Sequence, residues 1–142
     1  MTIDDTTLRR LLSQPCTIAV VGLSADPQRP SHDVARYLQR HGYRIVPVNP
    51  RYAASGESIL GEPCYASLGD IPFAVDIVDV FRRTEDVLPV AREAVQIGAK
   101  CLWQQIGVTN READALARAA GLASVMNLCL KIEHARLPGD YS

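Results

Sequence analysis

The sequence has little net charge and no long apolar run. Its 142 residues contain 15 Lys and Arg against 16 Asp and Glu, which leaves a formal charge of −1 at pH 7. Broad nucleic-acid binding needs a basic surface that neutralises many phosphates, so this balance excludes it. No run approaches the roughly 20 uncharged apolar residues of a membrane span, and the first ten residues carry acids where a secretory signal is basic. We therefore expect a cytoplasmic protein that contacts neither nucleic acid nor membrane.

Cysteine and histidine are scarce and scattered. The four cysteines form no C-x-x-C pair, which predicts reduced thiols rather than a disulfide framework. The three histidines lack the spacing of metal ligands, so we predict no metal site. Cys129 and His134 lie five residues apart, a spacing at which two helical side chains do not face each other. We assign no catalytic residue.

Apolar runs alternate with helical patterns along the chain. The runs predict five strands, at residues 17–21, 44–48, 74–81, 100–106 and 123–126. The expected caps of the main helices are Ser31, Thr84, and Thr109 with Glu112. Short connections between nearly continuous apolar strands are typical of an α/β fold with a doubly wound, mainly parallel five-stranded sheet and helices on both faces. We expect one domain over residues 1–142.

Three places in this pattern are less regular. Pro47 has no backbone N–H to donate, so the second strand must place it where that N–H would not pair with a neighbouring strand. Residues 51–63 are too rich in glycine and proline for a full helix, and residues 64–65 are predicted as a very short edge strand. Asp76 and Asp79 interrupt the third strand, so each must find solvent, a turn or a partner.

Polar and basic residues follow the strands at the edge where a parallel sheet binds its ligands. Gly22 lacks a Cβ and permits a tight turn with close approach of a phosphate to backbone N–H groups. Ser24 adds a hydroxyl donor, and Arg29 and Ser31 stand near the next helix start, where a cation and a hydroxyl can hold phosphate oxygens. Other strand ends supply Asn49, Pro50, Arg51, Phe81, Arg82, Arg83, Gln104 and Gln105. The combination predicts a phosphorylated ligand.

The dinucleotide fingerprint G-x-G-x-x-G is incomplete. After Gly22 the second and third glycines are absent, and Asn49 stands where an NAD ribose requires an acid. This disfavours an NAD(P)- or flavin-nucleotide domain acting as a redox sensor or dehydrogenase, which stays an alternative. A partner-binding module with a vestigial nucleotide pocket is the other alternative.

Several motifs together resemble one family. They are V-V-G-L-S-A-D-P-Q-R-P-S at 20–31, V-N-P at 48–50, D-I-V-D-V-F-R-R at 76–83, W-Q-Q-I-G-V at 103–108 and N-L-C-L-K-I-E-H at 127–134. With them the chain resembles the stand-alone CoA-binding domain family and, more weakly, the CoA-binding N-terminal domain of succinyl-CoA synthetase alpha subunits. The resemblance implies a Rossmann-like core over about residues 17–137 that holds coenzyme A or an acyl-CoA.

The same resemblance implies roles for individual residues. It places Ser24, Ala25, Asp26 and Pro27 in the nucleotide loop, Asn49, Pro50 and Arg51 near the phosphates, Phe81 and Arg82 beside the cofactor, and Gln104 and Gln105 near the pantetheine path. Ligase relatives need a second domain with a phosphohistidine, for which this chain has no room, so we expect binding without ligase activity. A homodimer or a complex with a partner enzyme is compatible with the sequence.

Overall fold

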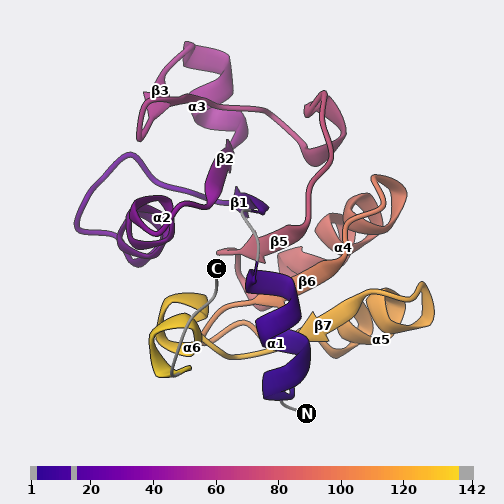
Figure 1. Cartoon of the computed structure of the whole chain (residues 1–142). Coiled ribbons are helices and arrows are strands. Elements are labelled where there is room, and N and C mark those ends of the chain that lie inside the picture. The colour runs from indigo at the N-terminus through magenta and orange to yellow at the C-terminus, as the bar shows by residue number, and fades with distance from the viewer. Residues whose placement is uncertain (1–2, 14–15, 138–142) are drawn as a thin grey trace.

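A computed structural model describes residues 3–13 and 16–137. Five parallel strands form one sheet in the order β2-β1-β5-β6-β7 (Figure 1). The strands are β1 (Thr17–Val21), β2 (Arg44–Val48), β5 (Ile77–Val80), β6 (Cys101–Gln104) and β7 (Ala123–Val125). The predicted doubly wound α/β class is therefore confirmed. Pro47 lies on the edge strand β2, where its missing N–H is tolerated.

Helices cover both faces of this sheet. They are α1 (Asp5–Leu12), α2 (Pro30–Arg40), α3 (Pro50–Ser55), α4 (Val87–Gln96), α5 (Arg111–Ala119) and α6 (Leu130–Arg136), with short 3-10 turns η1 (Leu68–Asp70) and η2 (Thr84–Asp86). In Figure 1, α1, α2 and α6 lie on one side of the strands, and α4 and α5 lie on the other. No helix in the described residues has both the length and the apolar character to cross a membrane.

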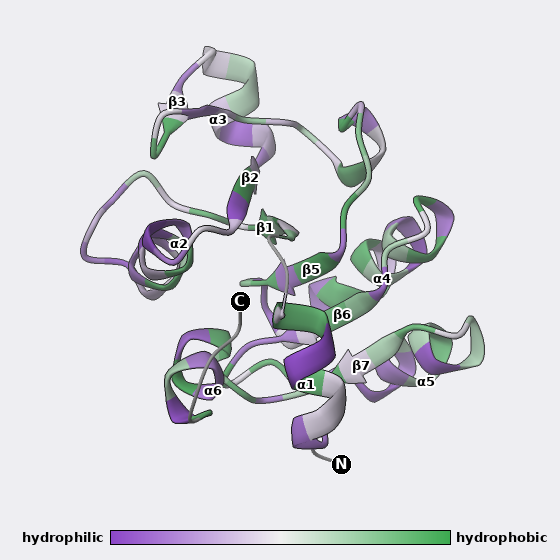
Figure 2. Cartoon of the chain, in the orientation of Figure 1, coloured by the Kyte–Doolittle hydropathy of each residue, from purple (hydrophilic) through white to green (hydrophobic). Residues whose placement is uncertain are grey.

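Alternating strand side chains divide the core into two layers. Ile18, Val20, Ile77 and Trp103 pack with α1, α2 and α6, whereas the residues between them pack with α4 and α5. Both layers are apolar, and in Figure 2 green is prominent in β1 and β5, whereas the helices alternate between green and purple. Burial on both faces explains why the strands read as continuous apolar runs.

Two of the predicted strands are shorter in the structure. β5 covers 77–80 rather than 74–81, because the Asp76 carboxylate accepts a hydrogen bond from the Thr17 N–H (2.8 Å) and pairs with Lys100 (3.2 Å). β6 covers 101–104 rather than 100–106, since the carbonyl of Gln105 accepts a turn hydrogen bond from Val108 (2.9 Å). The ends of both strands therefore belong to the loops that carry the polar residues.

The predicted helix caps are wrong. Arg29, not Ser31, precedes α2, because Pro30 is already suited to the first helical position. Asn110, not Thr109, caps α5, and its side chain accepts a hydrogen bond from Ala113 N–H (2.9 Å). Thr84 opens the turn η2 rather than α4. Each cap differs from the predicted one by one or two residues, within a stretch that holds several polar residues.

The segment after β2 holds more structure than its glycines and prolines predict. α3 lasts six residues and ends at Gly56, and a hairpin of β3 (Ser58–Ile59) and β4 (Glu62–Pro63) follows. In place of an edge strand at residues 64–65, Tyr65 alone forms a bridge with Val48. The sequence patterns above also predict neither α1 nor α6.

Candidate functional site

The strand order reverses between β1 and β5. The chain leaves β1 for β2 on one side and later returns to β5 on the other, and ligands of open α/β sheets bind at such a reversal. The ends of both strands are adjacent here, since Phe81 N–H donates to the Val21 carbonyl (2.9 Å). Gly22 has φ +88°, and a Cβ on it would overlap the Phe81 carbonyl oxygen. The reversal therefore requires glycine at this position.

A cavity of about 330 Å³ opens at the reversal, and we call it the polar cavity. Its lining comes from the ends of β1, β2 and β5 and from the starts of α2 and α3. The lining residues are Gly22, Ser24, Arg29, Pro30, Ser31, Asn49, Arg51, Tyr52 and Phe81. Hydroxyl, amide and guanidinium groups in this lining are all able to donate hydrogen bonds to an anion.

The first turn of α2 holds the loop that borders the polar cavity. Ser31 Oγ accepts a hydrogen bond from Ser24 N–H (3.1 Å), and His32 Nδ1 lies 2.9 Å from the Ser24 carbonyl oxygen. Ser24 Oγ accepts from Asp26 N–H (3.0 Å), which leaves its own proton free to donate. Ser31 and His32 thus position the loop, a role that the sequence does not reveal for His32.

Asn49 links the loop after β1 to the loop after β2. Its Nδ2 donates to the Leu23 carbonyl (3.1 Å), and its Oδ1 accepts from Arg51 N–H (3.1 Å) at the start of α3. The amide retains one N–H without a partner in these contacts. Asn49 therefore connects the two walls of the polar cavity and still has one donor for a ligand.

The basic side chains around the site differ in their partners. Within residues 3–13 and 16–137, Arg29, Arg51 and Arg82 form no ion pair. Arg83 is bound to Asp86 at 3.2 Å. Three cations at one edge of the sheet are thus available to an anionic ligand, whereas the charge of Arg83 is already balanced.

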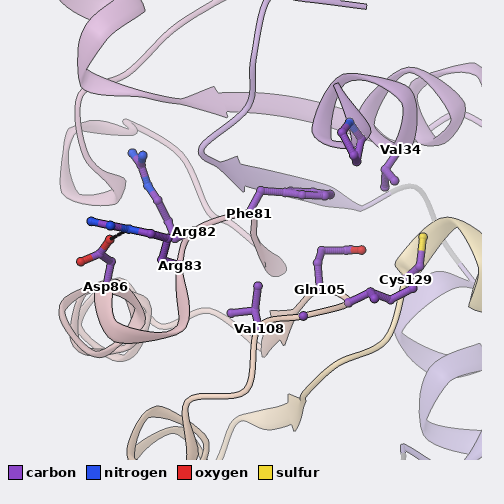
Figure 3. A pocket seen from close by; sticks show the side chains of 11 residues that line it. Val34, Phe81, Arg82, Arg83, Asp86, Gln105, Val108 and Cys129 are labelled. Carbon is purple, nitrogen blue, oxygen red and sulfur yellow. Dashed lines mark hydrogen bonds and ion pairs between the residues drawn. The ribbon is translucent and has the colours of Figure 1, made fainter. Parts of the chain in front are cut away.

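A larger cavity of about 840 Å³ adjoins the polar one and shares Pro30 and Phe81 with it. Figure 3 shows its walls: the arginines and Asp86 lie on one side, and Val34 and Cys129 on the other. The residues that line only this cavity are Val34, Arg82, Arg83, Asp86, Gln105, Ile106, Gly107, Val108 and Cys129. Ile106 is 63% exposed, which is unusual for a large apolar side chain in the described residues.

A buried carboxyl group holds one wall of the larger cavity. Asp79 is completely buried in β5, and Gln105 Nε2 donates a hydrogen bond to its Oδ1 (2.6 Å). Burial raises the pKa of Asp79 to about 7, and the hydrogen bond from Gln105 opposes that rise. Its Oδ2 has no hydrogen-bond partner among the described residues. The Asp79 carboxyl thus fixes the Gln105 side chain beneath the cavity.

The structure brings most of the predicted site residues together. Those that line a cavity are Gly22, Ser24, Arg29, Ser31, Asn49, Arg51, Phe81, Arg82, Arg83 and Gln105. Those that line neither cavity are Ala25, Asp26, Pro27, Pro50 and Gln104. The side chain of Gln104 is buried and bonded through both of its polar atoms to the backbone of Asn110, at 2.7 and 3.0 Å.

Sequence reasoning missed several lining residues. Ile106 ends the predicted fourth strand, and Gly107 and Val108 follow it directly, so their place at the carboxyl edge was the signal that could have identified them. Tyr52 and Cys129 lie four and three residues beyond the ends of predicted strands, but because α3 and α6 were not predicted, nothing distinguished them from other loop residues. No three His, Cys, Asp or Glu side chains gather as a metal site in the part of the chain that the structure describes.

A family model described as a CoA binding domain matches residues 16–135. The chain belongs to this CoA-binding domain family. The uncharacterized protein YneT of Bacillus subtilis (strain 168) is 40% identical over 128 residues, which cover 90% of this chain and 92% of that protein. A structure described as cell-free ID.343 from Thermus thermophilus is 42% identical with a TM-score of 0.89, covering 94% of this chain and 98% of that one.

The fold also occurs within a longer protein. The dinucleotide forming acetyl-coenzyme A synthetase 1 of Ca. Korarchaeum cryptofilum, solved in complex with phosphate and ADP, is 27% identical with a TM-score of 0.70. The match covers 82% of this chain and 26% of the synthetase. The family resemblance expected from the sequence motifs is confirmed, and this CoA-binding domain occurs both in small relatives and as part of a larger synthetase.

Proposed function

We propose that this member of the CoA-binding domain family binds coenzyme A or an acyl-CoA, without ligase activity of its own. The observation that carries the proposal is the pair of adjoining cavities at the strand reversal. The polar cavity is lined mainly by donors and two arginines, and the larger one has charged side chains on one side and a more apolar lining elsewhere. CoA is itself divided into a phosphorylated nucleotide and an uncharged pantetheine arm. A ligand of this kind matches both cavities at once.

The phosphates occupy the polar cavity in this proposal. Arg29 and Arg51, which have no ion-pair partner in the described residues, supply charge, and Ser24 supplies a hydroxyl donor. The remaining N–H of Asn49 orients the ribose or adenine. Ala25, Asp26 and Pro27 belong to the same loop as Ser24, and Pro50 precedes Arg51, so they support the lining rather than form it.

The pantetheine arm passes Pro30 and Phe81 into the larger cavity. Both residues line the two cavities and mark the passage between them. Arg82 stands near this passage and meets the extra phosphate or the pyrophosphate. Gln105 meets the arm itself, whereas Gln104 acts only through the start of α5.

Calorimetric titration tests the proposal with CoA, dephospho-CoA, NAD, NADP and FAD. We expect CoA to bind and the dinucleotides to bind far more weakly. Arg51→Ala removes a charge-assisted contact of about 2 kcal/mol and weakens CoA binding by about thirtyfold. Arg92→Ala is the matched control, because Arg92 is an exposed cation on α4 that lines neither cavity. Binding of NAD without binding of CoA, or equal losses in both variants, would contradict the proposal.

A further inference from the structure

The larger cavity contains a thiol that the proposed binding role does not use. Cys129 immediately precedes α6, is half-buried and lines the cavity. In Figure 3 the Cys129 sulfur lies on the same side of the cavity as Val34. Arg82 lies on the opposite side, and Phe81 and Gln105 lie between the two. A ligand whose arm enters past Phe81 therefore has its far end on the side where this sulfur lies.

Gln105 provides independent evidence for a ligand in the same space. Its side chain is only 3% exposed and lines the cavity. Asp79 binds its amide nitrogen, but the amide oxygen accepts no hydrogen bond in the described residues. Figure 3 shows this oxygen directed toward the side of the cavity that holds Cys129. The oxygen is therefore open to the cavity and can accept a hydrogen bond from an N–H or S–H group of a ligand bound there.

We propose that Cys129 is a site of thiol–disulfide exchange with CoA disulfide, which leaves one CoA covalently attached to this residue. The inference rests on the proposed binding of CoA in the two cavities. The pantetheine arm carries two amide N–H groups, either of which suits the Gln105 oxygen, and it ends in the sulfur that reacts.

The exchange balances without any further oxidant. Cys129 first loses its thiol proton to water, and its thiolate attacks one sulfur of the bound CoA disulfide. A new S–S bond forms between Cys129 and that CoA while the original S–S bond breaks. The second CoA leaves as a thiolate and takes up a proton. One disulfide replaces another, so no net oxidation or reduction occurs.

The other three cysteines serve as comparisons within the same molecule. Cys16 and Cys101 are buried, and burial raises the pKa of the Cys16 thiol to about 12 and also raises that of Cys101. Cys64 is half-buried like Cys129 but lines neither cavity, and burial raises the pKa of its thiol as well. Cys64 therefore reports the reactivity of an accessible thiol outside the site.

Mass spectrometry with peptide mapping tests the inference on reduced protein mixed with CoA disulfide. We expect the adduct to form at Cys129 at least about tenfold faster than at Cys64, because binding raises the local concentration of the disulfide. Cys129→Ser abolishes the fast adduct, whereas Cys64→Ser retains it. Excess desulfo-CoA slows the reaction at Cys129, and cystamine, which lacks the nucleotide, shows no tenfold preference for Cys129.

Calorimetry on the same samples separates the two proposals. CoA binding without a preferred adduct at Cys129 overturns the exchange site and leaves the binding function intact. Absence of CoA binding overturns the binding function, and the exchange site with it. The comparison of Cys129 with Cys64 in the unaltered protein needs no variant, so the test does not depend on how Cys129→Ser folds.

Discussion

The two cavities at the carboxyl edge of the sheet share two lining residues but differ in the parts of the chain that form their walls. Backbone turns and helix starts form the polar cavity, where Gly22, Ser24 and Asn49 are held by hydrogen bonds between neighbouring loops. Side chains line most of the larger cavity: several are apolar, three are charged on one side, and one is Gln105, which the buried Asp79 holds in place. One cavity thus depends on backbone conformation, and the other depends on side-chain packing.

This difference indicates how an amphipathic ligand would be oriented. Anionic groups gain most from fixed donors and cations, whereas a flexible arm gains mainly from removal of apolar surface from water. Because only Pro30 and Phe81 line both cavities, substitutions elsewhere should affect one end of the ligand and spare the other. The predictions below test that separation.

Gly22→Ala should have the largest effect, because Gly22 packs against the backbone of Phe81, a residue that lines both cavities. The added Cβ overlaps the Phe81 carbonyl oxygen at a backbone φ of +88°. We expect the free energy of unfolding to fall by about 3 kcal/mol or more, with loss of CoA binding. Urea denaturation measures the change. Gly121→Ala is the control, since Gly121 has φ +89° but no atom within 4 Å of an added Cβ, and it should cost only about 1 kcal/mol. Equal costs would refute the steric explanation.

Asp79→Asn should alter how the free energy of unfolding depends on pH. Asp79 is the buried carboxyl group that holds Gln105, a residue of the larger cavity. The unfolded chain releases the Asp79 proton near its usual pKa of 3.8, whereas the folded protein retains it up to about pH 7. Between these values the folded state binds more protons, so stability falls as pH rises. We expect the unaltered protein to lose about 2 kcal/mol more than Asp79→Asn between pH 5 and pH 8.

Urea denaturation at the two pH values measures this difference. The exposed Asp70→Asn is the control and should follow the unaltered protein. If Asp79→Asn shows the same pH dependence as the unaltered protein, the Asp79 carboxyl is not protonated in the folded state at pH 5.

Ile106→Ser should have the smallest effect, and the effect should be limited to the part of the ligand in the larger cavity. Removing this exposed side chain from the larger cavity should weaken octanoyl-CoA binding by about 1 kcal/mol, roughly fivefold, with a smaller loss for CoA. Ile132→Ser is the control, because Ile132 is also exposed (55%) and lines neither cavity. Calorimetric titration with both ligands measures the losses. Equal losses for CoA and octanoyl-CoA would show that Ile106 does not contact the acyl group.

Elements with a simple pattern were predicted best. The bounds of β1 and β2 match the apolar runs, because strands buried on both faces require apolar residues throughout. Helix starts were predicted less well. At each start two candidates lie within two residues of each other, Arg29 with Ser31 and Thr109 with Asn110, and the choice depends on tertiary hydrogen bonds. α1 was not predicted, although it contributes Leu8 and Leu12 to the core, because eight residues carry too short a pattern.

The candidate site divides in the same way. Residues next to a strand end, such as Gly22, Asn49 and Phe81, could be placed at the edge because parallel strands share one direction. Gln104 and Gln105 are adjacent in sequence, yet only Gln105 reaches a cavity. Neighbouring strand residues point to opposite faces, and the exact end of β6 decides which face each occupies.

The sequence by itself determined that the net charge is near zero, that the fold is a parallel α/β sheet, and that Arg29, Arg51, Arg82 and Arg83 follow its strand ends. Only the tertiary structure decided that these arginines divide between two cavities, that Asp86 balances Arg83, and that Cys129 shares the larger cavity with Arg82 and Arg83. The physical reason is the sequence distance over which each property is set. Apolar periodicity can be recognised within one segment, whereas a cavity forms where loops distant in sequence pack together.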